Sequence, residues 1–231
     1  MLAKMTSLNL KGDVEGRYLK NLITDISPRT AAMVVGIAFI ISVLIVTLVD
    51  DFLLANFVVP GDTATLAKDI EANTRLFGFA VFGYLLVLVL DSIIGLALYV
   101  VLKPANKKLA LLTAGLRLLY AGALVIGLFA LVLQFIDVYG YALIKLWGYV
   151  FFALHILVLG YSVLKSGYIP KSLGILLIIA SFSYVVFFIE LQLPEAFLVL
   201  IMLTMLSAEL ALSIWLIVKR NSLPEKIFSR R

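Results

Sequence analysis

The chain contains no cysteine and a single histidine, His155. The absence of cysteine excludes disulfides, thiolate metal sites, iron–sulfur clusters and cysteine nucleophiles. One histidine excludes a bis-histidine haem or a multi-histidine zinc site within one chain. Charged side chains are also scarce, at 14% of residues, whereas 63% are hydrophobic. Soluble domains carry about 25% charged and about 45–50% apolar residues, so this composition is typical of an integral membrane protein.

Sequence motifs that would identify an enzyme are missing as well. The chain has no phosphate-binding glycine loop, no His-Glu-x-x-His, no Gly-x-Ser-x-Gly and no aspartate-rich metal signature. We therefore predict no metal and no cofactor, and we favour a protein that is not an enzyme while leaving that question open. The net charge of +5 predicts no nucleic-acid surface, because the basic residues lie in short segments beside apolar runs.

Apolar segments long enough to cross a bilayer predict an all-α integral membrane protein, a bundle of six transmembrane helices. A Ser27-Pro28 pair, typical of a helix start, precedes the first of them. The segments cover about residues 31–59, 76–102, 109–136, 147–164, 172–191 and 196–218. This transmembrane domain, residues 30–219, follows a polar arm (1–29) and precedes a basic tail (220–231). We also expect a short amphipathic helix over residues 63–75.

The distribution of basic residues predicts how the helices are oriented. Most of the 19 lysines and arginines lie in the N-terminal arm, in the turns 103–108 and 165–171, and in the C-terminal tail. Short loops rich in Lys and Arg stay on the cytoplasmic side of a membrane. Both termini are therefore predicted to be cytoplasmic, in a multi-pass protein of the plasma membrane whose first partner is the lipid bilayer.

Ionisable residues inside the predicted spans are Asp91, Arg117, His155 and Glu209. At about 1.5 Å per helical residue, all of them lie roughly 14–18 Å from the cytoplasmic surface, near the middle of the bilayer. A charge at that depth costs roughly 2.5–3.5 kcal/mol on insertion scales, so such residues face a bundle interior and pair with one another. We therefore predict one polar site made by these residues, with Tyr120 as a further hydrogen-bond donor beside Arg117.

Several motifs extend along most of the chain. They are Gly61-Asp62-Thr63-Ala64 with Asp69-Ile70-Glu71-Ala72-Asn73 and Arg75; Asp91 with Leu98-Tyr99 and Leu102-Lys103-Pro104; Leu116-Arg117-Leu118 with Tyr120-Ala121; and His155 with Gly160-Tyr161, Ser166-Gly167-Tyr168-Ile169-Pro170 and Leu173-Gly174. Together they resemble a prokaryotic multi-pass membrane family catalogued as domain of unknown function 4386, over about residues 30–219. This resemblance implies a small multi-pass protein without an established activity, with Asp91, Arg117 and His155 inside the matching motifs.

Three functional hypotheses are compatible with these features. The first is a site at the bilayer midplane that binds or transports a small or amphiphilic ligand, or a lipid, with Arg117 holding an anionic group or tethered to Asp91 and Glu209. The second is an integral-membrane enzyme that acts on a lipid-like substrate by acid–base chemistry of Asp91, His155 and Glu209. The third is a non-catalytic subunit that packs against another membrane protein or forms a homo-oligomer, its buried ion pairs serving only to fix helix pairing.

Overall fold

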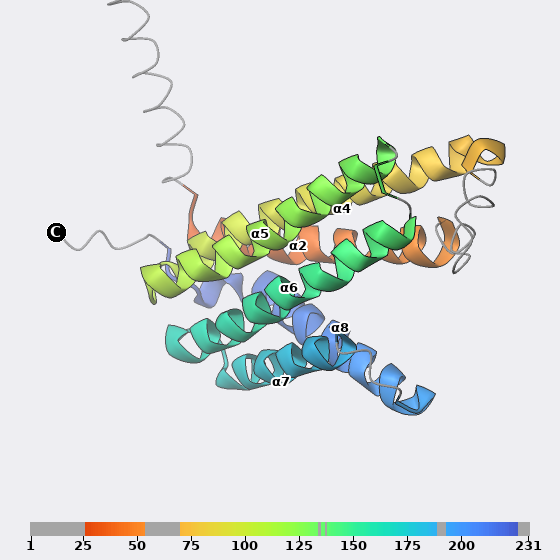
Figure 1. Ribbon diagram of the computed structural model, residues 1–231. Coiled ribbons are helices and arrows are strands. Elements are labelled where there is room, and N and C mark those ends of the chain that lie inside the picture. The colour runs from red at the N-terminus through yellow and green to blue at the C-terminus, as the bar shows by residue number, and fades with distance from the viewer. Residues whose placement is uncertain (1–25, 54–69, 134, 137, 189–192, 226–231) are drawn as a thin grey trace, which may run out of the picture.

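The computed structural model describes residues 26–53, 70–133, 135–136, 138–188 and 193–225 (Figure 1). These residues are almost entirely helical, and no strand occurs within the described ranges. In chain order the elements are α2 (Pro28–Thr47), the π-helical segment η1 (Leu48–Leu53), α4 (Thr74–Leu102), α5 (Lys107–Val132), α6 (Val138–Ser166), α7 (Lys171–Phe188), α8 (Glu195–Val218) and the 3₁₀ turn η3 (Arg220–Ser222).

The long helices form a closed ring. Each packs against the next along the chain, and α8 returns to pack against α2 (Figure 1). Successive helices run in opposite directions, so the start of α2 and the end of α8 lie at the same end of the bundle. There the Arg29 Nε–H donates to the carbonyl oxygen of Leu223 at 3.1 Å. We call this the terminal end, and the end with η1 and the start of α8 the far end.

Length and apolarity make this a helical membrane protein. Within the described ranges, five helices are long and apolar enough to cross a bilayer, namely those built on α2, α4, α5, α6 and α8. The remaining long helix, α7, is apolar but shorter. The sequence predicted this span to continue to residue 191, and residues 189–192 lie outside the part of the chain that the structure describes.

Local sequence signals account for where two of the helices begin. The Ser27 hydroxyl accepts a hydrogen bond from the Thr30 N–H at 3.2 Å, and Pro28 occupies the first turn of α2. At α5 the Asn106 side-chain oxygen accepts from the N–H groups of Lys108 and Leu109, at 3.0 and 3.1 Å. Both caps satisfy backbone donors that the first helical turn leaves without partners.

The two largest differences between predicted and observed helix boundaries concern the start of the fourth span and the end of the first. The sequence placed the start of the fourth span at Trp147, after a loop of residues 137–146, but α6 already begins at Val138. The basic side chain of Lys145 favoured a loop, whereas the ammonium pairs with Asp50 at 2.8 Å and is accommodated within a helix. The first span, predicted to reach residue 59, changes from α2 to η1 after Thr47. Residues 54–69, which include most of the predicted amphipathic helix, lie outside the described ranges, as do most of the arm and half of the tail.

Candidate functional site

Arg117 extends from α5 into the middle of the ring, where only 3% of its surface is exposed. The buried residues beside it on the same helix are small: Thr113, Ala114 and Ala121. On the facing helix α4, a Cβ added at Gly95 would lie 3.5 Å from the Arg117 Cβ, so the two helices approach closely here. Small side chains therefore leave room for the guanidinium inside the bundle, as is common where membrane helices pack.

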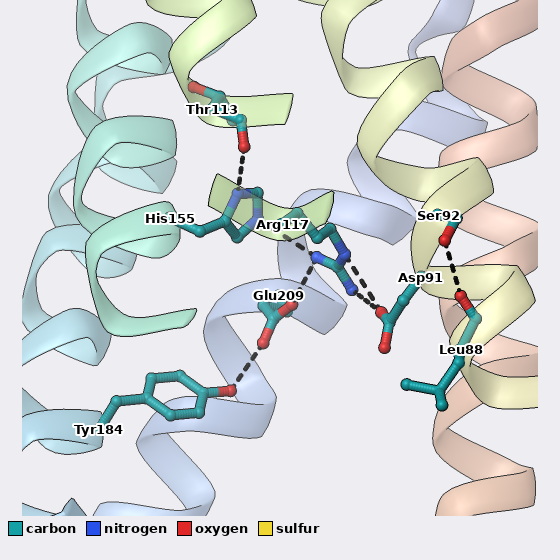
Figure 2. Close-up of polar contacts among 8 residues, drawn as sticks. All are labelled: Leu88, Asp91, Ser92, Thr113, Arg117, His155, Tyr184 and Glu209. Carbon is teal, nitrogen blue, oxygen red and sulfur yellow. Dashed lines mark hydrogen bonds and ion pairs between the residues drawn. The ribbon is translucent and has the colours of Figure 1, made fainter. Parts of the chain in front are cut away.

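Asp91 on α4 is the closest ion-pair partner of Arg117 (Figure 2). Its Oδ1 accepts two hydrogen bonds from the guanidinium, from Nη2–H at 2.5 Å and from Nε–H at 3.1 Å. The other oxygen, Oδ2, has no hydrogen-bond partner among the described residues. One carboxylate oxygen of Asp91 thus binds the arginine, and the other remains available.

Glu209 on α8 is the second acid, and it connects the arginine to two further helices. Its Oε2 accepts from the Arg117 Nη1–H at 3.5 Å, while its Oε1 accepts from the Tyr184 hydroxyl of α7 at 2.8 Å. The ion pair with Arg117 is longer than the one made by Asp91. Glu209 is therefore positioned as much by a tyrosine as by the arginine (Figure 2).

His155 on α6 is completely buried and both of its ring nitrogens are engaged. Nδ1 lies 2.8 Å from the carbonyl oxygen of Thr113, and Nε2 lies 3.3 Å from Nη1 of Arg117. A carbonyl oxygen only accepts, so Nδ1 carries the proton. Nε2 then accepts a hydrogen bond from the guanidinium, so His155 is neutral and acts as an acceptor for Arg117.

Of the four ionisable residues predicted from helix depth, Asp91, His155 and Glu209 each contact Arg117 directly, and Tyr184 joins them through Glu209. We call Asp91, Arg117, His155, Tyr184 and Glu209 the central network. Each comes from a different helix, α4 to α8. Buried charges in a membrane bundle require this mutual pairing, because lipid offers no hydrogen-bond partner.

A pocket of about 300 Å³ lies against the central network. It extends from the network toward the far end, because its other lining residues lie at the middle or in the far-end halves of their helices. Tyr120, the predicted donor, lines this pocket instead of bonding to Arg117. The lining consists of Phe39, Ser42, Val43, Val46, Thr47, Val87, Asp91, Arg117, Tyr120, Tyr149, Phe152, Tyr184, Met202, Met205, Leu206 and Glu209.

The pocket reaches the surface of the bundle beside α8. Two of its lining residues on that helix, Met202 and Leu206, are 55% and 42% exposed. None of the residues from Glu195 to Ser207 is buried, whereas Ala208, Glu209, Leu212, Ser213 and Leu216 are. The first half of α8 correspondingly runs away from α2 in Figure 1. The pocket therefore opens at an apolar surface that a bilayer would cover.

On the terminal side of Arg117 and Glu209 the bundle is packed. The space between them and Val35, Leu98 and Leu212 amounts to only about 10 Å³, no more than a single water needs. The central network is therefore the floor of a pocket that is closed toward the terminal end.

A second polar cluster lies one helical turn beyond the pocket. The Lys145 ammonium donates to both Asp50 oxygens, at 3.0 and 2.8 Å, and to the Tyr84 hydroxyl at 3.0 Å; that hydroxyl also bonds to Asp50. Asp50, Tyr84 and Lys145 lie three or four positions along the chain from pocket-lining residues, which are Thr47, Val87 and Tyr149 respectively. We call Asp50, Tyr84 and Lys145 the far-end cluster.

Sequence reasoning missed two features of this site. Tyr184 is uncharged, so a search for ionisable residues within spans passes over it, although it lies at a similar depth to the predicted residues. The far-end cluster was missed because a search at the middle of the predicted spans passes over Asp50, near the outer end of the first span, and Lys145, between the third and the fourth. A basic residue flanked by aromatic and aliphatic side chains, as in Ile144-Lys145-Leu146-Trp147, is the signal that could have revealed it.

Comparison with known proteins identifies one matching family and one similar protein. Residues 34–135 and 130–219 match the sequence model of a family described as Domain of unknown function (DUF4386). A protein from Archaeoglobus fulgidus, described as an uncharacterized protein, is 32% identical over 149 residues, which are 64% of this chain and 88% of the relative. No solved structure matches the chain.

Proposed function

Because the chain belongs to the family described as Domain of unknown function (DUF4386), we propose a function from the chain's own pocket: it binds a small amphiphilic ligand from the bilayer and holds the polar group of that ligand beside the central network. The observation that carries this proposal is the pocket itself. Its volume of about 300 Å³ is at the lower end of the range for ligand sites, and its mostly apolar wall with a few convergent polar groups is typical of them.

The opening beside α8 supports a ligand that enters from the lipid. Met202 and Leu206 contribute both to the pocket wall and to the outer surface of the bundle. An alkyl chain can therefore lie among apolar side chains along its whole path, while its polar group reaches Asp91, Arg117 and Glu209. A purely water-soluble ligand would find no comparable apolar match at this opening.

The proposal includes a topology of six spans with both termini in the cytoplasm, in the plasma membrane. The ring arrangement supports it, since α7 lies in sequence and in space between helices that are long enough to cross a bilayer. Basic residues within the described ranges gather at the terminal end, as expected for a cytoplasmic side. They are Arg29, Lys103, Lys107, Lys108, Lys165, Lys171, Lys219 and Arg220.

Transport would be an extension of this binding. A carrier with a midplane site needs that site to be closed toward one side of the membrane at a time. The packed core on the terminal side of Arg117 meets this requirement for one state. Acid–base catalysis by His155 is less well supported, because His155 does not line the pocket and both of its nitrogens are occupied.

The proposal is tested by protection of a single thiol, which the cysteine-free chain makes straightforward. Ser42→Cys places the thiol in the pocket wall, Leu44→Cys places one on the exposed side of the same helix, and Ala72→Cys places one at the exposed far end. Each variant is reconstituted in lipid nanodiscs and modified with N-ethylmaleimide, with and without decanol, decanoate or decyltrimethylammonium.

At least one amphiphile is expected to slow modification of Ser42→Cys severalfold while leaving Ala72→Cys unchanged. Leu44→Cys reports any general effect of the amphiphile on the bilayer, and the protection of Ser42→Cys should exceed it. The proposal fails if none of the three compounds protects Ser42→Cys more than Leu44→Cys.

A further inference from the structure

From the charges and rings around the pocket we infer that its ligand is a hydrophobic cation of the alkylammonium class. This inference rests on the proposed function and specifies the chemistry of the ligand that the pocket holds. It also selects among the possibilities that the sequence left open, in which Arg117 could have held an anionic group.

With Asp91 and Glu209 both ionised, the charges beside the pocket leave a net negative site. Asp91 and Glu209 are two carboxylates, Arg117 is one guanidinium, and His155 is the neutral tautomer. Asp91 is only 5% exposed, yet its Oδ2 has no hydrogen-bond partner among the described residues and the side chain lines the pocket. A cation in the pocket would pair with that oxygen through charge, with or without an N–H to donate.

An anionic ligand would meet the opposite situation. The guanidinium already donates through Nε, Nη1 and Nη2 to Asp91, Glu209 and His155. A carboxylate that displaced either acid would add a third negative charge around one arginine, in surroundings that screen charge poorly. The Coulomb energy therefore favours a cation over an anion at this position.

Five aromatic residues line the pocket, and two of them, Phe152 and Tyr184, contact Arg117 and Glu209. The five are Phe39, Tyr120, Tyr149, Phe152 and Tyr184. The Tyr120 and Phe152 rings lie 4.7 Å apart, those of Phe152 and Tyr184 5.0 Å, and those of Tyr149 and Tyr184 6.1 Å. Such a wall attracts ammonium groups through the negative faces of the rings. The guanidinium of Arg117 already lies 5.1 Å from the centre of the Phe152 ring.

The chemistry of the wall also points away from an inorganic cation. A metal ion prefers several oxygen or nitrogen ligands, and no group of three or more histidine, cysteine or acidic residues suited to a metal occurs within the described ranges. Met202, Met205 and Leu206 would remain unused by a bare ion. An alkylammonium uses both parts of the pocket, with its charged group at the acids and its chain among these side chains.

The test uses the Ser42→Cys chain in nanodiscs and compares three amphiphiles of equal chain length. Decyltrimethylammonium is expected to give half-maximal protection at a concentration at least about tenfold lower than decanol or decanoate, the effect of one added ion pair, since this quaternary ammonium has no N–H to donate. Adding Asp91→Asn should reduce that preference for the cation over decanol about tenfold. Sodium chloride at equal ionic strength should give no protection.

Two outcomes separate this inference from the proposed function. If decanol or decanoate protects as well as the ammonium, the pocket binds amphiphiles and the cation inference is wrong. Equal protection by sodium chloride would show an effect of ionic strength or of an inorganic cation, and it would also contradict the inference. If nothing protects Ser42→Cys, the proposed function itself fails. Should Asp91→Asn not fold, Tyr149→Leu provides the second variant, because loss of a pocket ring should lower the preference for the cation about threefold. An unchanged preference in that variant would contradict the inference.

Discussion

At the scale of single residues, Arg117 determines how the centre of the bundle is arranged. Its guanidinium contacts Asp91, His155 and Glu209 from three other helices and lies over the ring of Phe152. Such a charge is tolerated inside a membrane protein only when its partners are present. Removing one member of this set therefore leaves the remaining charges buried without a partner, and the loss of stability exceeds the energy of the contacts removed.

Arg117→Met should lower the free energy of unfolding by about 3–5 kcal/mol, because two buried carboxylates lose their cationic partner. The change is measured by chemical unfolding of the purified protein in detergent micelles, followed by tryptophan fluorescence. Arg75→Met, at an exposed position, serves as the control and should alter stability little. The triple variant Arg117→Met, Asp91→Asn, Glu209→Gln should be more stable than Arg117→Met alone. A single variant as stable as the wild type would contradict this account of the network.

His155→Ala separates a structural role from one in ligand binding. The side chain is completely buried and makes two hydrogen bonds, so its loss should cost about 2–4 kcal/mol of stability. Because His155 does not line the pocket, protection of Ser42→Cys by decyltrimethylammonium should persist at a temperature where the variant is folded. Loss of protection in a folded variant would show that His155 contributes to ligand binding.

At the scale of helices, close contacts between backbones hold neighbouring elements together. The clearest example joins α6 and α7 through two glycines. A Cβ at Gly160 would lie 2.8 Å from the carbonyl oxygen of Gly174, and a Cβ at Gly174 would lie equally close to that of Gly160. This crossing brings α7 against α6 and so positions Tyr184 beside Glu209.

Gly160→Ala should therefore destabilise the protein, by about 1–3 kcal/mol, because the new methyl group overlaps backbone that cannot move independently. Gly122→Ala on α5 is the matched control, since a Cβ there meets nothing within 4 Å. Alanine favours helix over glycine, so this control should be neutral or slightly stabilising. Thermal unfolding of both variants in one detergent distinguishes them. Equal effects of the two substitutions would show that helix propensity, not the crossing, decides the result.

At the scale of the whole molecule, the helices surround a pocket that lies between two polar clusters. The central network lies on its terminal side and the far-end cluster on its far-end side. In the proposed topology the terminal end, where the basic residues gather, faces the cytoplasm. If α7 crosses the membrane, the start of α8 and the start of α7 lie on opposite sides of it.

Single-cysteine labelling in intact cells checks this topology. A membrane-impermeant maleimide is expected to label Ala72→Cys and Ala196→Cys, which lie exposed at the far end. Ala105→Cys and Ser172→Cys, exposed at the terminal end, should be labelled only after the membrane is permeabilised. If Ala196→Cys and Ser172→Cys react on the same side, α7 does not span the membrane and the six-span topology is wrong.

The helical membrane character of the chain follows from the sequence alone. Long apolar segments must satisfy their backbone hydrogen bonds within themselves in lipid, so they form helices whatever their neighbours are. Residues such as Arg117 are equally informative, because a charge in such a segment has to find partners in other helices. Depth along each helix placed Asp91, Arg117, His155 and Glu209 at one level of the bilayer. It did not give the direction in which each side chain points.

Which of these side chains meet, and what lies beside them, was decided by the tertiary structure. Rotation of each helix depends on contacts such as that between Gly160 and Gly174, which involve residues far from the network. Packing also brought the uncharged Tyr184 to Glu209 and the lysine of a predicted loop to Asp50. The pocket, its opening beside α8 and the acids and rings that line it depend on how several helices are arranged together. Analysis of each segment by itself cannot predict that arrangement, because it depends on contacts between segments.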